Sequence, residues 1–315
     1  MILALAGGVG GARLAQGLVQ VLAPDELGIA VNVGDDFEHL GLQVCPDLDT
    51  VMYTLAGVHN TEVGWGRADE TWHFMQAIER LGGETWFRLG DRDLAVHVER
   101  TRRLRDGEPL SAITAAFCAH LGVRHPVMPA SDQRLRTRVL TDAGELEFQD
   151  YFVRRRCEPA VRGLRFDGAQ AALPSPALAA LIASGNITGI VVCPSNPWLS
   201  IAPMLAIGAL GGLIDAQRVP VVAVSPIIAG RAVKGPAGKI MRELGGGSDA
   251  LGIVNYYGAR VGGWVIDQQD AALAGAIEAA GHQVLATDTL MSSPERARQL
   301  AQATLDLLNA AGART

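Results

Sequence analysis

The hydrophobic pattern alternates short, wholly apolar runs with longer stretches that are apolar on one side only. The runs at residues 2–6, 27–32, 189–193 and 221–224 need no polar face, which is typical of buried parallel strands, and shorter ones follow at 264–266 and 283–286. Helical spacing follows most of these runs, at residues 12–21, 51–58, from 201 onward, 270–280 and 294–308. Strands that alternate with helices predict an α/β fold with a doubly wound, mostly parallel sheet.

Residues 60–122 interrupt this rhythm. Trp65, Trp72, Trp86 and much of the charge lie here, with helical patterns at residues 70–81, 94–104 and 111–121. We therefore expect an α/β core over residues 1–59 and 123–315 and a smaller helical insertion over 60–122. Within the insertion, residues 88–93 are expected to form a charged turn. Farther on, alternation at 138–140 and 146–152 around Asp142-Ala143-Gly144 predicts a hairpin.

The first apolar run is followed at once by Gly7, Gly8, Gly10 and Gly11. A strand, a glycine turn and a helix N-terminus make an anion site, because glycine lets the backbone approach a phosphate and the free N–H groups of the helix point at it. A tight turn with no ligand is the plainer interpretation, but each glycine weakens the local chain unless something requires it. The spacing fits neither G-x-G-x-x-G nor a P-loop, so it predicts a phosphate site without naming the nucleotide.

Other polar turns follow the predicted strands, and ligands bind at that edge of such sheets. They contribute Asn32, Asp35, Asp36, Ser195, Asn196 and Ser225, and Asp47 and Asp49 stand nearby in the chain. Aspartates beside a phosphate loop predict Mg²⁺, a hard cation that takes one or two carboxylates plus phosphate oxygens. The alternatives stay open: Asp47 or Asp49 as a helix cap, and Ser195 and Asn196 as turn residues.

Composition narrows the class of partner. The chain has 315 residues, 49% hydrophobic content and a net charge of −6, so we expect no nucleic-acid partner. The apolar stretches are too interrupted for a bilayer span, there is no basic leader before the first strand, and the four cysteines match no zinc spacing. We expect a cytoplasmic protein without a membrane partner, in which His39, His59 and His73 are structural.

A series of short motifs indicates a protein family. The chain resembles the 2-phospholactate transferases of coenzyme F420 biosynthesis (the CofD/FbiA family). The motifs that carry the resemblance run in the family's order over nearly the whole chain: GGVGGAR (7–13), VNVGDD (31–36), CPDLDT (45–50), GWG (64–66), LGDRDLA (89–95), PASD (129–132), FQDYFV (148–153), PSNP (194–197), SPIIAG (225–230), GPAGK (235–239) and DTLM (288–291).

The resemblance implies a Rossmann-like core with a smaller helical part, in a homodimer. It implies an enzyme that joins the deazaflavin Fo to the phosphoacid half of a guanosine diphosphate ester, with Mg²⁺, and releases GMP. Asp49 and Arg88 fall where the family holds Fo, and Asp91 and Trp65 lie in the same part of the chain.

From these indications we formulate a mechanism as a hypothesis. Mg²⁺ on Asp35 and Asp49 would take up phosphate charge, and Asp49 would orient or deprotonate the attacking hydroxyl. The glycine loop and Arg13 would hold the diphosphate. The transferred acid (phospholactate, phosphoenolpyruvate or phosphoglycerate) stays open, and Lys239 or the helix after residues 235–238 would bind its carboxylate.

Two other functions remain possible on the sequence. A nucleotide-sugar-binding regulator of the same superfamily would keep the glycine loop but need no Fo site. An NAD-dependent oxidoreductase is permitted by the fold class, although the glycine spacing argues against it.

Overall fold

The computed structural model describes residues 1–62, 64–233 and 237–313. At its centre lies a seven-stranded sheet in the order β14-β13-β10-β9-β1-β2-β5, and every pair in it is parallel. This confirms the predicted α/β class. The strands are β1 (Ile2–Ala6), β2 (Leu27–Val31), β5 (Val127–Pro129), β9 (Gly189–Val192), β10 (Val221–Val224), β13 (Gly263–Asp267) and β14 (Gln283–Thr287).

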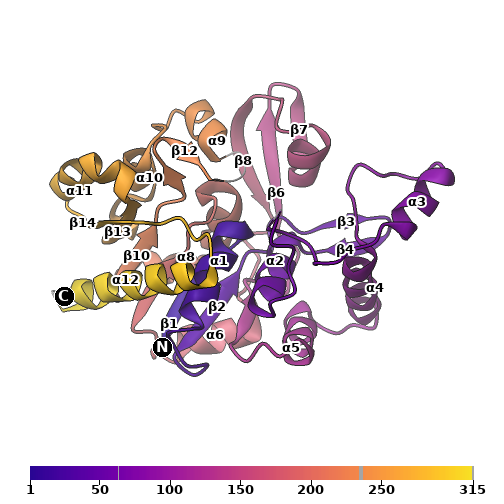
Figure 1. Ribbon diagram of the computed structural model, residues 1–315, viewed down its shortest axis with the longest axis horizontal. Helices are drawn as coiled ribbons and strands as arrows, with labels where there is room; N and C mark the ends of the chain where they lie inside the picture. Colours follow the sequence, from indigo (N-terminus) through magenta and orange to yellow (C-terminus); the bar gives the residue numbers. More distant parts are fainter. Residues whose placement is uncertain (63, 234–236, 314–315) are drawn as a thin grey trace.

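Helices cover the two faces of this sheet. One layer is formed by α1 (Gly8–Leu18), which packs between α2 (Pro46–Leu55) and the long C-terminal α12 (Pro294–Gly312); Figure 1 shows α12 in yellow beside α1. The other regular helices and helical turns of the core are α6 (Pro176–Ala183), α7 (Ala202–Leu205), α8 (Gly208–Asp215), α9 (Ala237–Glu243), α10 (Ala250–Tyr257), α11 (Ala274–Ala279), η2 (Pro197–Ile201), η3 (Gly258–Arg260) and η4 (Gln268–Leu273).

The strand order reverses at β1. From β1 the chain builds outward through β2 and β5 on one side, then returns to place β9 on the other side of β1. In such sheets the crevice beyond the carboxyl ends of the two strands that flank the reversal is the usual ligand site. Here the loops after β1 and β9 form that crevice.

A second, smaller hydrophobic cluster lies apart from the main core. It is centred on four buried residues, Phe37, Val44, Met75 and Leu89. They come from the hairpin β3 (Phe37–His39) and β4 (Leu42–Val44), from α3 (His73–Arg80) and from the segment before α4 (Asp91–Arg105). Figure 1 shows α3, α4 and this hairpin together at one end of the molecule.

The helices expected between residues 70 and 121 are present, with changed limits. The third, α5 (Leu110–His120), packs beside β5 and contributes Leu110 and Cys118 to the main core. The charged turn expected at 88–93 is wrong for its second half, because α4 already begins at Asp91.

A three-stranded antiparallel sheet, β7-β6-β8, stands beside the main one. Its strands β6 (Arg136–Thr141) and β7 (Gly144–Glu147) confirm the predicted hairpin, and β8 (Val161–Asp167) pairs with β6. The prediction that the second strand of the hairpin continues to residue 152 is wrong. Instead the π-helix η1 (Asp150–Arg154) forms, and helical spacing stacks Phe148 on Phe152 with ring centroids 5.4 Å apart.

The remaining strands form a short antiparallel pair, β11 (Ile227–Ile228) with β12 (Arg231–Ala232). Within the described ranges, no single helix is both long and apolar enough to cross a bilayer. One helix pair meets that test jointly, Pro197–Leu205 with Gly208–Asp215, and it is bent by 98°.

Candidate active site

The glycine run lies inside the first turn of α1 rather than before it. The helix begins at Gly8, so the expected start at residue 12 is one turn too late. Gly8 has φ +63°, a left-handed conformation that favours glycine. A Cβ on Gly10 would collide with the carbonyl oxygen of Pro194, and one on Gly11 would press on Ser195 Oγ. These glycines therefore let the loops after β1 and β9 touch, which is a packing requirement independent of any phosphate.

Asp47 ties the glycine run to the end of β2. Its Oδ1 accepts a hydrogen bond from the Gly8 N–H at 2.7 Å, and its Oδ2 accepts one from Asn32 Nδ2 at 3.0 Å. Asn32 Oδ1 in turn accepts from the Gly34 N–H at 2.8 Å. The Gly8 N–H is therefore already bonded, which corrects the expectation that the first N–H groups of this helix are all free. Burial raises the pKa of Asp47 above its usual value.

Asp35 and Asp36 are buried and form no ion pair with any described residue. Their exposed fractions are 6% and 3%, and Oδ1 of each has no hydrogen-bond partner among the described residues. Burial, followed by the charge of Asp47, raises the pKa of Asp35 well above its usual value. Burial also raises the pKa of Asp36 to about 7, although the charge of Arg136 opposes this shift. Two carboxylates in such a state favour binding of an external cation.

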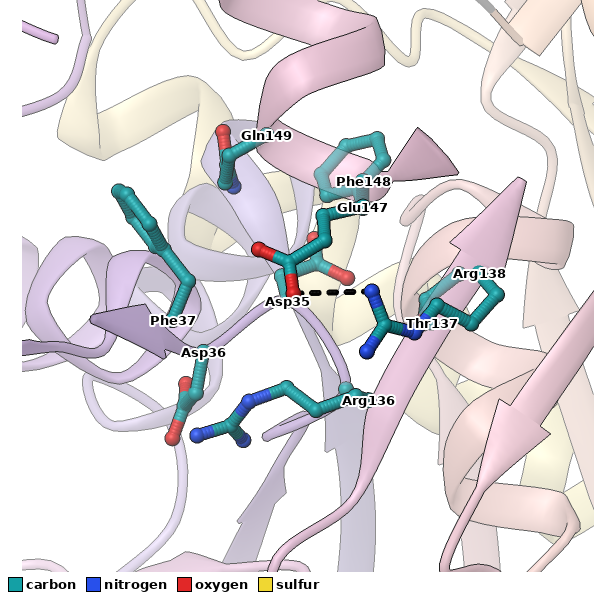
Figure 2. A pocket seen from close by; sticks show the side chains of 10 residues that line it. Asp35, Asp36, Phe37, Arg136, Thr137, Arg138, Glu147, Phe148 and Gln149 are labelled. Carbon is teal, nitrogen blue, oxygen red and sulfur yellow. Dashed lines mark hydrogen bonds and ion pairs between the residues drawn. The ribbon is translucent and has the colours of Figure 1, made fainter. Parts of the chain in front are cut away.

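Figure 2 shows the small cavity that these aspartates line, between β3 and the β6–β7 hairpin, with the Arg138–Glu147 ion pair at 2.8 Å as its dashed line. The cavity shares part of its lining with a larger groove of about 520 Å³. The groove adds the rings of His39 and Trp86, whose centroids are 5.1 Å apart, and Arg154, whose guanidinium lies 4.6 Å from the Trp86 centroid. The buried carboxylates and the aromatic wall therefore border adjoining spaces.

Asp49 is in a different environment from Asp35. Both of its oxygens accept hydrogen bonds from the buried guanidinium of Arg100, Oδ2 from Nη1 at 3.0 Å and Oδ1 from Nη2. His97 lies 3.7 Å from Asp49 and 3.3 Å from Asp93, and Asp93 accepts a hydrogen bond of 2.7 Å from the Tyr53 hydroxyl. Burial lowers the pKa of Arg100, but the charge of Asp49 more than offsets this and raises it. A metal ion at Asp49 would have to compete with Arg100.

Of the expected Fo-binding residues, Arg88 and Asp91 lie beside the smaller cluster. Arg88 stacks over the Trp72 ring at 4.2 Å, and Trp65 is 51% exposed. Asp91, in contrast, is occupied: it accepts hydrogen bonds from the Thr71 hydroxyl and from the N–H groups at 73 and 74, at the start of α3. Among these three residues, Trp65 and Arg88 present free surface, whereas Asp91 is a helix cap.

The nucleotide- and phosphate-binding residues expected in the second half of the chain differ in their surroundings. Ser195 Oγ accepts the Gly7 N–H at 3.0 Å, so it belongs to the crevice. Asn196 caps η2 through the N–H groups of residues 198 and 199, which is the turn role left open above. Ser225 exchanges hydrogen bonds with the backbone of Ile227. Lys239 pairs with Glu243 at 2.7 Å and donates to the Pro159 carbonyl at 2.8 Å, while residues 235 and 236 lie outside the described ranges.

The sequence analysis missed Arg100 and His97. With Asp93 they occupy positions i, i+4 and i+7 of α4, which lie on one helix face, and all three side chains meet in the Asp49 network. An arginine on the same face as a histidine and an aspartate is the signal that could have identified them. Arg136 and Arg138, which line the cavity, follow only from the hairpin register.

Comparison with known proteins identifies the family and supports the fold. The family model "2-phospho-L-lactate transferase CofD" matches residues 2–305. The phosphoenolpyruvate transferases of Streptomyces avermitilis and Nocardia farcinica are 42% and 39% identical to this chain, covering 97% of it in each case and 97% and 94% of the relatives. A crystal structure of a UPF0052 family member from Bacillus halodurans has the same fold, with a TM-score of 0.62 and 14% identity over 96% of this chain and 98% of that one. The chain belongs to the CofD 2-phospho-L-lactate transferase family.

Proposed function

We propose that this transferase moves a phosphoacid from a guanosine diphosphate ester to the ribityl hydroxyl of the deazaflavin Fo and releases GMP. The observation that carries the proposal is a pair of adjoining spaces: a small cavity lined by Asp35 and Asp36, which each have a buried oxygen without a partner among the described residues, and an aromatic groove. The cavity of about 10 Å³ has room for an ion but not for a diphosphate, and a planar ring fits the groove. Because the related proteins are named phosphoenolpyruvate transferases, we take the transferred acid to be the enolpyruvyl one.

The residues present fit Mg²⁺. Asp35 and Asp36 offer buried carboxylate oxygens without partners, the hard ligands that this ion takes together with phosphate oxygens. Asp35 would be the principal ligand. Asp49 lies near enough for its charge to act on Asp36, but Arg100 holds it, so we assign it to positioning the acceptor. When bound, the metal would neutralise the charge that develops on the leaving phosphate.

The donor would lie in the crevice between β1 and β9. There the first turn of α1 presents backbone N–H groups other than that of Gly8, which Asp47 already accepts, and Gly10 and Gly11 leave no side chain between the two loops. The positive end of the helix favours phosphate oxygens at this point.

The acceptor would lie along the groove. His39 and Trp86 give its ring an aromatic wall, and Trp65 and Arg88 would add contacts to the acceptor. In the reaction the ribityl oxygen forms a bond to the phosphorus that bears the acid, and the bond from that phosphorus to the GMP oxygen breaks. GMP leaves with the electron pair, and the hydroxyl proton passes to a carboxylate within reach.

The test is direct. The protein is incubated with Fo, the guanosine-diphosphate-linked enolpyruvyl donor and Mg²⁺, and GMP is measured by chromatography. Stoichiometric GMP and a phosphorylated deazaflavin support the proposal. A protein that binds the donor but forms no GMP would be a binding module, and an NADH-dependent absorbance change would indicate a dehydrogenase.

A further inference from the structure

Three basic residues lie beside α1 and α2, outside the cavity and groove described above. Arg13 lies on α1, and His59 and Arg67 form a β-bridge to each other just after α2. The guanidinium of Arg67 lies 5.3 Å from the centroid of the Tyr53 ring, on α2. The charge of Arg13 reaches His59 and, after burial, is the next cause that lowers the pKa of this imidazole.

This basic cluster lacks its own counter-charge. His59 is only 6% exposed, yet neither of its ring nitrogens has a hydrogen-bond partner among the described residues, and Nε of Arg67 is also buried without one. Over the same ranges, Arg13 and Arg67 take part in no ion pair. Asp93, which contacts the same Tyr53, is already bonded to its hydroxyl and paired with His97. Buried donors in this state need a partner, and an anion would supply one.

We propose that Arg13, His59 and Arg67 bind the carboxylate of the phosphoacid donor. The inference rests on the proposed function and adds a residue-level basis for recognition of the acid. Arg13 follows Gly8 by five residues on α1, which is about 7.5 Å along the helix axis. If the diphosphate binds at the start of the helix, the acid has to extend over only a few bonds to reach the cluster. Two guanidinium groups and a neutral imidazole suit the two oxygens of a carboxylate.

The contacts of Lys239 make it poorly suited to binding the carboxylate of the donor. Its ammonium is already paired with Glu243 and bonded to the Pro159 carbonyl, so binding a carboxylate would cost those contacts. Within the described ranges, Arg13 and Arg67 have no ion pair to give up, and Arg67 only contacts the Tyr53 ring.

The experiment compares two ligands that differ only in the acid. Binding of GDP and of the guanosine-diphosphate-linked enolpyruvyl donor is measured by calorimetry for the wild type, Arg67→Ala and Arg13→Ala, without Fo. Each substitution should weaken donor binding about ten- to a hundredfold, since a hydrogen bond to a charged group is lost. GDP binding should stay within about twofold. Arg67→Lys should recover part of the loss, and Arg102→Ala, at an exposed ion pair on α4, is the matched control.

Two results would overturn the inference: equal weakening of GDP and donor, which assigns the cluster to the diphosphate, and unchanged binding of both, which makes it structural. If Arg67→Ala does not fold, the ratio of donor affinity to GDP affinity in Arg13→Ala decides the question. Arg13 is at a half-buried helix position. Failure of the proposed function is distinct. It would leave the wild type without GMP formation, whereas failure of this inference alone leaves turnover intact with an unchanged ratio of donor to GDP affinity.

Discussion

Two groups of buried aspartates lie close together in this molecule, and they are neutralised in opposite ways. Asp49 and Asp93 are surrounded by Arg100 and His97, which lie on the same helix face as Asp93. Asp35 and Asp36 face a cavity, and each keeps one buried oxygen without a partner. The first group is complete within the protein and stabilises it. The second is incomplete, so its charge is available for a ligand at the expense of stability.

Removing the internal cation should have the largest effect. Arg100→Met leaves Asp49 buried without its partner, and such losses cost about 3–5 kcal/mol. The free energy of unfolding, measured by urea denaturation, should fall by that amount. The control Arg102→Met removes an exposed ion pair on the same helix and should change stability by about 0.5 kcal/mol or less. A stable Arg100→Met protein would contradict the view that Asp49 is held by this pair.

Removing the uncompensated charge should separate activity from stability. Asp35→Asn is expected to lower kcat about a hundred- to a thousandfold, as for the loss of one group that stabilises a transition-state charge. Its melting temperature should stay equal or rise, because a buried carboxylate without a partner is gone. Asp49→Asn should lower both, because Arg100 is then left unpaired. Full turnover by Asp49→Asn would remove it from the acceptor site.

Metal removal supplies the control for Asp35→Asn. EDTA should abolish wild-type activity, and Mg²⁺ should restore it and raise the melting temperature. Asp35→Asn should show a much smaller thermal response to Mg²⁺, since a ligand of the ion is lost. Undiminished wild-type activity in chelator would refute a metal at Asp35.

These contrasts show how far the sequence could lead. The apolar runs predicted six of the seven strands of the parallel sheet, all except β5, and the glycine run marked the crevice, because both signals are local. The partner of Asp49 is not local: Arg100 is 51 residues away and meets it only when α4 packs beside the β3–β4 hairpin. Likewise, the collision of a Cβ at Gly10 with Pro194 depends on β9 lying next to β1. Asp49 was expected to be a second metal ligand because it is close in sequence to other aspartates. In the folded protein its carboxylate is instead bonded to Arg100.

The pH dependence of stability should reflect the buried carboxyl groups whose pKa the fold raises, Asp35, Asp36 and Asp47. The pKa of Asp36 is raised to about 7 in the fold, so the native state binds a proton that the unfolded chain releases near pH 4. The contribution of Asp36 to stability is therefore fully present at low pH and falls as pH rises toward 7, by on the order of 1 kcal/mol per pH unit. Urea denaturation at pH 5, 6 and 7 without metal should show this fall. Asp36→Asn should make the fall less steep by that amount, and an unchanged slope in that variant would assign the effect elsewhere.

The smallest effect is expected at Lys239, a third charge that the fold already neutralises. Its ammonium is partly exposed and pairs with Glu243 within α9, so Lys239→Ala should cost about 1 kcal/mol or less. The donor KM should stay within about twofold, because the ammonium is engaged by Glu243 and Pro159 and the unpaired guanidinium groups are elsewhere. Steady-state kinetics with varied donor at saturating Fo measures this. A donor KM that rises tenfold while the Fo KM stays constant would return the carboxylate to Lys239, and would show that an internal ion pair can open for the substrate.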